Sequence, residues 1–172
     1  MSASADSSVL VADVGGTNLN LALLAPEGSR YRLLRKARFR TQEETSLLDP
    51  VRRFLEEDPA LRPVRASFSA AGPVLDRRIH LTNAPWDIDA SALERSLGMP
   101  IHLVNDFTAL SCGVLQLDLG DPAQVTPLAH GDGSLPPADP RGLALVVGAG
   151  TGLGVGFVVR TAQGARAFPR EG

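Results

Sequence analysis

The chain has 172 residues, 44% of them hydrophobic, with a formal net charge of −2 at pH 7. This composition is typical of a chain with an apolar core, and the charge argues against general binding to nucleic acid or an anionic membrane. One cysteine excludes an internal disulfide bond, so we expect a reducing, cytoplasmic setting. No apolar run reaches membrane-spanning length, and we expect residues 1–8, which carry no basic residue, to form a disordered tail.

A pair of glycines joins the first two apolar runs. Residues 9–14 predict a strand, and the period-two alternation over 19–25 predicts another, so the glycine turn lies between strands. Rossmann and Walker loops open a helix instead. Glycines still allow backbone N–H groups to converge on an anion, and Asp13 could hold a hydrated Mg²⁺ beside a phosphate. The alternative is a plain β-hairpin turn.

The next segments predict a third strand, a helix and a fourth strand. Residues 30–40 alternate basic with apolar side chains, which favours a charged sheet edge over a polyanion-binding patch. Apolar residues at helical spacing predict a helix over 46–57, and residues 64–71 predict a strand. We expect a small hairpin within 74–81, around Asp76.

A short helix and a strand-to-helix junction follow. Asp89 or Ser91 is expected to cap a helix that Gly98 closes. Residues 101–104 predict a strand, and helical spacing continues to Leu117, with Cys112 expected to be buried. Asn105 and Asp106 therefore lie at a strand's carboxyl end, where α/β folds bind ligands. The alternatives are that Asn105 is a turn residue and that Asp106 is a helix N-cap.

A second glycine hairpin follows a loop predicted over 118–141. Residues 143–159 repeat the order of apolar run, Gly/Thr turn and β-rich run, and Thr17 aligns with Thr151. Asp13 aligns with Val147, so only the first copy carries a carboxylate. Two related hairpins indicate two lobes that hold one polyphosphate, and a further strand is expected from residue 166.

These motifs resemble those of bacterial glucokinase, in the order in which that family carries them. The matching segments are 13–18, 71–73, 81–83 with Trp86, 105–109, 148–154 and 169–172. The resemblance implies an α/β fold of the ribonuclease-H-like, actin-like ATPase type. Its small N-terminal domain, with a mixed sheet, would span 9–117, the inter-lobe loop 118–141, and the first strands of a second, truncated lobe 142–172.

The resemblance also implies roles for individual residues. Asp106 resembles the base that accepts the proton of the sugar 6-hydroxyl, and Asp13 would hold Mg²⁺ through water. The implied sugar-binding residues are Asn105, Glu171 and Asn83. The implied phosphate-binding residues are Gly15, Gly16, Thr17 and Asn18 in the first hairpin and Gly148, Gly150, Thr151 and Gly152 in the second.

The implied activity is ATP-dependent phosphorylation of glucose to glucose 6-phosphate. The alternatives are a kinase of another hexose or an aminosugar, and a non-catalytic sugar-sensing protein, which would need an added DNA-binding domain. The sequence stops inside the family's Glu-Gly-Gly-His motif, so we expect a fragment without measurable activity by itself. Both association into a homodimer and a mobile C-terminal segment are left open.

Overall fold

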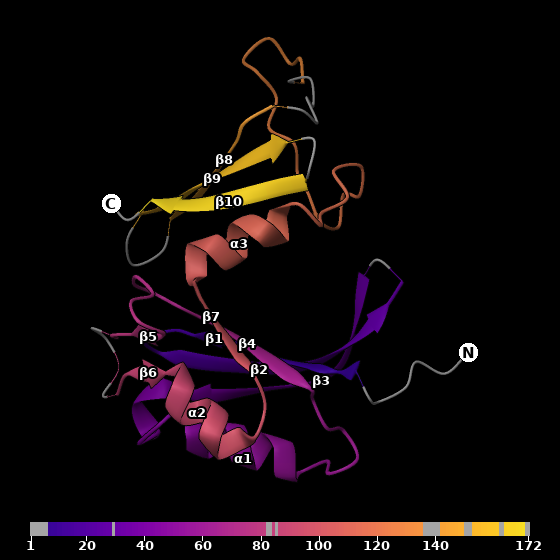
Figure 1. Ribbon diagram of the computed structural model, residues 1–172. Helices are drawn as coiled ribbons and strands as arrows, with labels where there is room; N and C mark the ends of the chain where they lie inside the picture. The colour runs from indigo at the N-terminus through magenta and orange to yellow at the C-terminus, as the bar shows by residue number, and fades with distance from the viewer. Residues whose placement is uncertain are drawn as a thin grey trace. The chain divides into compact units, whose positions relative to one another are not determined.

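The computed structural model describes residues 7–28, 30–81, 84, 86–135, 142–149, 153–161 and 164–170 (Figure 1). The chain packs as two compact units, one ending at Asp106 and the other beginning at Phe107. The division predicted from the sequence, with a boundary after residue 117, stays a prediction. Ser8, assigned above to the tail, is fully buried, and its hydroxyl donates to the carbonyl oxygen of Arg62.

The first unit contains a mixed five-stranded sheet in the order β3-β2-β1-β4-β7. Three strands form an antiparallel meander, and β4 and β7 run parallel to β1. The strands are β1 (Val9–Val14), β2 (Asn18–Glu27), β3 (Arg30–Arg40), β4 (Arg65–Ala70) and β7 (Ile101–Asn105). The α/β class with a mixed sheet, predicted from the sequence, is confirmed.

Helices α1 (Leu48–Glu56) and α2 (Ala90–Leu97) share one apolar core with this sheet. The alternation in β2 explains which face is covered, because Leu19, Leu21 and Leu23 are buried between half-buried neighbours. The N-cap of α2 is Asp89, whose carboxylate accepts the N–H of Ala92 at 3.0 Å. Gly98 closes the helix in the left-handed conformation, with φ 69°.

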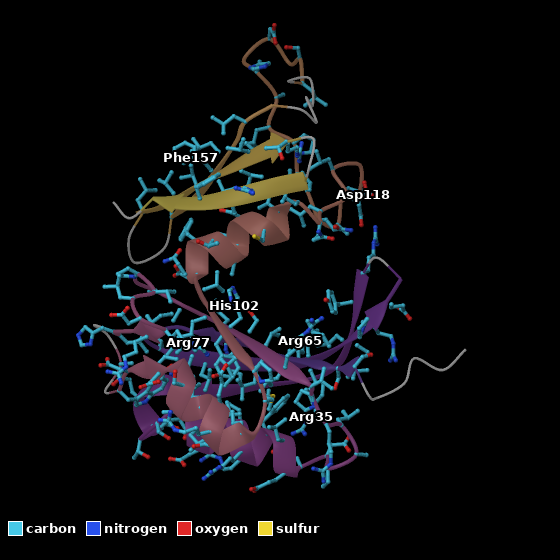
Figure 2. The ribbon with its side chains drawn as sticks, in the orientation of Figure 1. Arg35, Arg65, Arg77, His102, Asp118 and Phe157 are labelled. Atoms are coloured by element: carbon cyan, nitrogen blue, oxygen red, sulfur yellow. The ribbon has the colours of Figure 1, made fainter. Side chains whose placement is uncertain are left out.

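Strand β3 lies at the sheet edge, as its charge pattern predicted. Its basic side chains at 36, 38 and 40 are exposed, while Arg35 bonds to α1. Arg35 is labelled in Figure 2. Its Nη1 group donates to the carbonyl oxygen of Phe54 at 2.7 Å, and Nη2 pairs with Glu57. The cations of this strand therefore shield an edge and anchor a helix.

The predicted small hairpin turns at Asp76 and Arg77, which both have positive φ, 47° and 63°. Leu75 and Arg78 exchange two backbone hydrogen bonds across this two-residue turn. The strand after it, β5 (Arg78–Ile79), also pairs with β6 (Ile88–Asp89), a strand that the sequence analysis did not predict.

The second unit carries most of α3 (Asp106–Val114) and an antiparallel sheet in the order β10-β9-β8. Its strands are β8 (Ala144–Ala149), β9 (Leu153–Thr161) and β10 (Gly164–Arg170). Helix α3 ends earlier than its apolar spacing predicted, and Cys112 is exposed, so its predicted burial is wrong. No helix in the described part of the chain is long and apolar enough to cross a membrane.

Candidate functional site

The first glycine hairpin is a tight turn between β1 and β2. Its last ladder pair is Val14 with Leu19, and the N–H of Gly15 donates to the carbonyl oxygen of Asn18 at 2.9 Å. A Cβ atom at Gly15 would lie 3.1 Å from that oxygen, closer than side chains normally approach. Glycine at position 15 therefore allows the turn to close tightly.

Residues of a short 3₁₀ helix, η2 (Thr41–Glu43), bind the carbonyl groups of this turn. The Thr41 hydroxyl donates to the Gly15 carbonyl at 2.7 Å, and the Gln42 amide donates to the Gly16 carbonyl at 3.0 Å. The Thr41 backbone N–H donates to the Thr17 carbonyl at 3.0 Å. No acceptor among the described residues takes the N–H groups of Gly16 and Thr17. The turn thus has bonded carbonyls and open N–H groups, an arrangement that suits an anion.

Thr41 and Gln42 were not predicted from the sequence. Their signal lay in the strand lengths, because β3 returns antiparallel to β2 until Arg40 lies opposite Asn18. The next residue must then reach the glycine turn. This pairing can be counted from the connecting turn only once the β-bulge between Leu23 and Leu24, which shifts the register by one residue, is also known.

Asp13 lies at the end of β1, on the sheet face away from the buried residues Ala12 and Val14. Its carboxylate accepts the Asn20 amide at 3.2 Å, and the Ser69 hydroxyl, which donates to the Ala12 carbonyl at 3.1 Å, lies 3.5 Å away. No cluster of three His, Cys, Asp or Glu side chains that could hold a metal occurs among the described residues. One exposed carboxylate with neutral neighbours fits Mg²⁺ that keeps most of its water ligands.

Asn105 ends β7, next to Ala70 of β4 in the parallel register. It is only 8% exposed, and its amide donates to the Gly72 carbonyl at 3.2 Å. It is therefore a strand residue tied to the 71–73 segment, and the alternative of a turn residue is wrong. Asp106 follows as the half-buried first residue of α3. The carboxyl ends of β1, β4 and β7 bring Asp13, Gly72 and Asn105 to one edge of the sheet.

The described part of the second glycine hairpin packs against α3. Gly148 and Gly154 face each other in the β8–β9 register, and the ring of Phe107 lies over both. A Cβ atom at Gly148 would lie 2.7 Å from the ring, one at Gly154 would overlap it, and one at Gly156 would overlap the Ser111 hydroxyl. These glycines therefore make room for a helix, and phosphate binding by Gly148 stays a prediction.

Several predicted site residues lie outside the described residues. They are Asn83, Gly150, Thr151, Gly152 and Glu171. Among the described residues, Asp13, the first hairpin and the Asn105–Asp106 junction all belong to the first unit.

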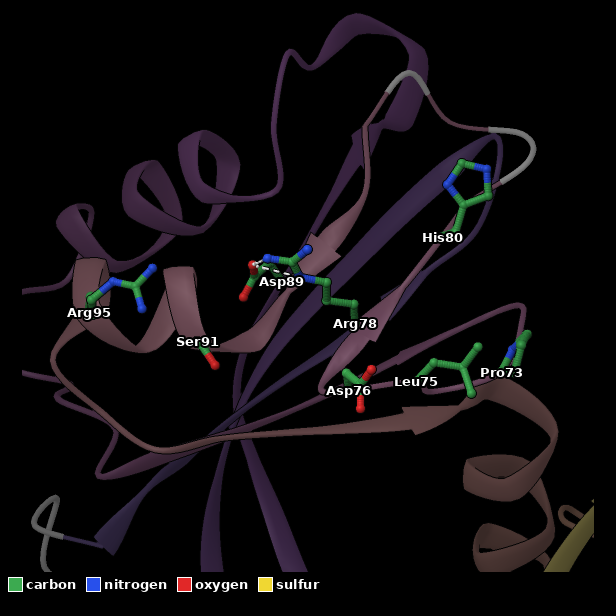
Figure 3. Close-up of a pocket in the computed structure, with 8 residues that line it drawn as sticks. All are labelled: Pro73, Leu75, Asp76, Arg78, His80, Asp89, Ser91 and Arg95. Atoms are coloured by element: carbon green, nitrogen blue, oxygen red, sulfur yellow. Dashed lines mark hydrogen bonds and ion pairs between the residues drawn. The ribbon is translucent and has the colours of Figure 1, made fainter.

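A cavity of about 550 Å³ opens beside β5, β6 and α2 (Figure 3). None of the predicted site residues lines it. Nε and Nη2 of Arg78 contact the Asp89 carboxylate at 3.0 and 2.7 Å, and His80 Nδ1 lies 2.7 Å from Asp87. The N–H of Ala92, followed by Arg78, holds the pKa of Asp89 below its ordinary value. Arg78, Asp89 and His80 are therefore paired with neighbouring side chains, and the residues that the sequence predicted for the site lie elsewhere.

Relatives of this chain are found by sequence. The glucokinase of Nostoc punctiforme is 33% identical over 168 residues, which cover 95% of this chain and 46% of that protein. The glucokinase of Stenotrophomonas maltophilia is 38% identical over 166 residues, covering 95% and 48%. The chain therefore spans about half the length of the curated relatives it matches.

Solved structures agree with these relatives. A glucokinase from an Antarctic psychrotroph superimposes with a TM-score of 0.82 at 30% identity, over 96% of this chain and 50% of that chain. Glucokinase from Balamuthia mandrillaris, solved in complex with glucose, gives a TM-score of 0.73 at 21% identity, covering 96% and 48%, a likeness in fold alone. The predicted actin-like ATPase fold is thus confirmed. The glucokinase family model matches residues 10–172, and the chain belongs to the glucokinase family.

Proposed function

We propose that this chain supplies the first phosphate-binding hairpin and the catalytic base of an enzyme that phosphorylates glucose with ATP. One observation carries the proposal: the Gly15–Gly16 turn has its carbonyls bonded to η2 and its N–H groups open, beside the Asp13 carboxylate. Such a turn suits an anion through its backbone, and for a member of the glucokinase family the proposed anion is the polyphosphate of ATP.

The proposed base is Asp106. As the 6-hydroxyl oxygen of glucose bonds to the γ-phosphorus, the bond from phosphorus to the ADP oxygen breaks and the hydroxyl proton passes to the Asp106 carboxylate. Phosphoryl transfer depends mainly on positioning and on neutralising charge, so one well-placed carboxylate suffices. Its place directly after Asn105, at the carboxyl edge of the sheet, supports this role.

Asn105 is the proposed sugar ligand within the described residues. An amide both donates and accepts hydrogen bonds, which suits ring hydroxyls. Its tether to the Gly72 carbonyl fixes the amide plane before sugar arrives. Asn83 and Glu171 are proposed to add further sugar contacts, and Gly148 with residues 150–152 a second phosphate loop.

Asp13 is proposed to hold Mg²⁺ through water. The Asn20 and Ser69 contacts orient its carboxylate without adding charge. When bound, the ion would neutralise charge on the phosphate oxygens. We also propose a cytoplasmic location, in keeping with the single cysteine.

The test is a coupled assay for glucose 6-phosphate with the full-length protein. Asp106→Asn should lower kcat by several orders of magnitude while glucose binding stays within about tenfold, because an amide cannot accept the proton but keeps the size of the side chain. Near-normal turnover of this variant would remove Asp106 from the mechanism. Mannose, fructose and glucosamine, assayed in parallel, separate glucose from other hexoses and aminosugars.

A further inference from the structure

The segment that follows β3 contacts the first glycine hairpin and the loop around Trp86. Thr41 and Gln42 bond to the carbonyls of Gly15 and Gly16, as described above. Two residues later, the carbonyl oxygen of Glu44 accepts the indole N–H of Trp86 at 3.0 Å. Residues 41–44 therefore bond both to the proposed phosphate loop and to Trp86.

The segment is anchored from a third direction. The Glu44 side chain, only 9% exposed, pairs with Nη2 of Arg53 on α1 at 2.5 Å. Thr41 is fully buried, and its hydroxyl makes the shortest of the bonds to the turn, at 2.7 Å. A buried side chain whose hydroxyl is hydrogen-bonded has few alternative rotamers, so the Thr41 hydroxyl stays directed at the Gly15 carbonyl.

The orientation of the turn depends on these bonds. A peptide group that rotates exchanges the positions of its N–H and its carbonyl oxygen, and a carbonyl oxygen aimed at a phosphate repels it. The Thr41 hydroxyl and the Gln42 amide bond to two successive carbonyls of the turn. Removing the hydroxyl would leave the Gly15 carbonyl without that donor and free the peptide group to rotate.

We infer that Thr41, assisted by Gln42, is a positioning residue that holds the first glycine hairpin in the orientation that accepts nucleotide phosphate. This inference rests on the proposed function, since it names what keeps the proposed phosphate loop in shape. The Thr41 side chain contacts the turn at the Gly15 carbonyl, on the side opposite the open N–H groups, and it is not a catalytic residue.

The experiment compares Thr41→Val with Thr41→Ser in the full-length protein. Valine keeps the shape of threonine but loses the hydroxyl, whereas serine keeps the hydroxyl and loses a methyl group. Calorimetric titration with Mg·ADP and steady-state kinetics with ATP and glucose give separate affinities for the two substrates. Thermal unfolding of each variant measures the general loss of stability.

For Thr41→Val we expect the dissociation constant of Mg·ADP and the KM for ATP to rise about tenfold, the change that corresponds to one hydrogen bond. The KM for glucose should stay within about twofold. Thr41→Ser should keep the nucleotide affinity of the wild type, because its hydroxyl still donates to the Gly15 carbonyl. We expect this even if its melting temperature is as low as that of Thr41→Val.

Three results with the variants, and one with the wild-type protein, would overturn the inference. Unchanged nucleotide affinity in Thr41→Val would show that Thr41 only supports the fold, as would equal losses for ATP and glucose. Failure of serine to restore affinity would point to packing. If the wild-type protein binds Mg·ADP but phosphorylates no sugar, while Thr41→Val weakens that binding, the proposed function fails and the inference stands. If the wild-type protein binds no nucleotide, both fail.

Discussion

The packing of the Phe107 ring against Gly148 and Gly154 leads to a quantitative prediction for Gly154→Ala. The added Cβ atom would overlap the Phe107 ring, so the ring or helix α3 must move. Overpacking of this kind costs about 1–3 kcal/mol. Replacing glycine also restricts the unfolded chain, which returns about 0.4–1 kcal/mol. Phe107 is half-buried, and the two opposing effects together give an expected net loss of about 1–2 kcal/mol.

Hydrogen exchange of the β8 and β9 amides, followed by mass spectrometry, measures this loss within the second unit. A loss of about 1–2 kcal/mol raises the open population roughly 5–30-fold. Gly113→Ala is the matched control: it lies in α3 with nothing within 4 Å of an added Cβ, so the exchange of α3 should slow. Phe107→Leu combined with Gly154→Ala should recover part of the loss. Exchange in Gly154→Ala as slow as in the wild type would refute the packing argument.

Three further predictions concern the phosphate loop, the cap of α2 and the second sheet. Gly16→Val should raise the KM for ATP more than the KM for glucose, since a side chain obstructs the approach of phosphate, and equal effects would point to misfolding instead. The pKa of Asp89 is lowered in the folded state. Its ionised carboxylate therefore stabilises the fold above the ordinary pKa of 3.8, and this stabilisation is lost as the pH falls through the lower pKa of the folded state. In urea titrations from pH 7 to pH 2.5, Asp89→Asn should lose less stability than the wild type. The polypeptide of these 172 residues alone should show no glucose phosphorylation and should self-associate, because Leu145, Val147 and Leu153 are more than half exposed. An active monomer in the coupled assay and in light scattering would contradict that expectation.

The central part of the fold could be predicted because its signals are local. Alternation identified β2, charged alternation identified β3 as an edge, and Asp89 and Gly98 marked both ends of α2. Strand β6 was missed because two residues cannot show a period, and its pairing with β5 depends on a contact across the 80–87 loop. The end of α3 was placed too late because Leu117 continued the apolar spacing beyond the hydrogen-bonded helix.

The candidate site divides along the same line. Motif residues such as Asp13 and Asn105 are visible in the sequence because they interrupt apolar runs at strand ends. Their partners Asn20, Ser69 and Gly72 come from register and from strand order, which no single segment encodes. The packing role of Gly148 was missed for a similar reason, since glycine leaves the same mark in a sequence whether it admits a phosphate or an aromatic ring.

The pairing of β1, β2 and β3 makes the first glycine hairpin depend on the turn at the far end of the meander. The β2–β3 connection passes through Gly28, which has φ 61°, a conformation that few other residues adopt. Together with the β-bulge between Leu23 and Leu24, this turn sets the pairing of Arg40 with Asn18, and with it the arrival of Thr41 at the Gly15 carbonyl. A slip of one residue would turn every β3 side chain to the other face and carry Thr41 away from the hairpin. We therefore expect substitutions at Gly28 to weaken the proposed nucleotide binding from the opposite end of two strands, without changing any residue proposed to bind the nucleotide.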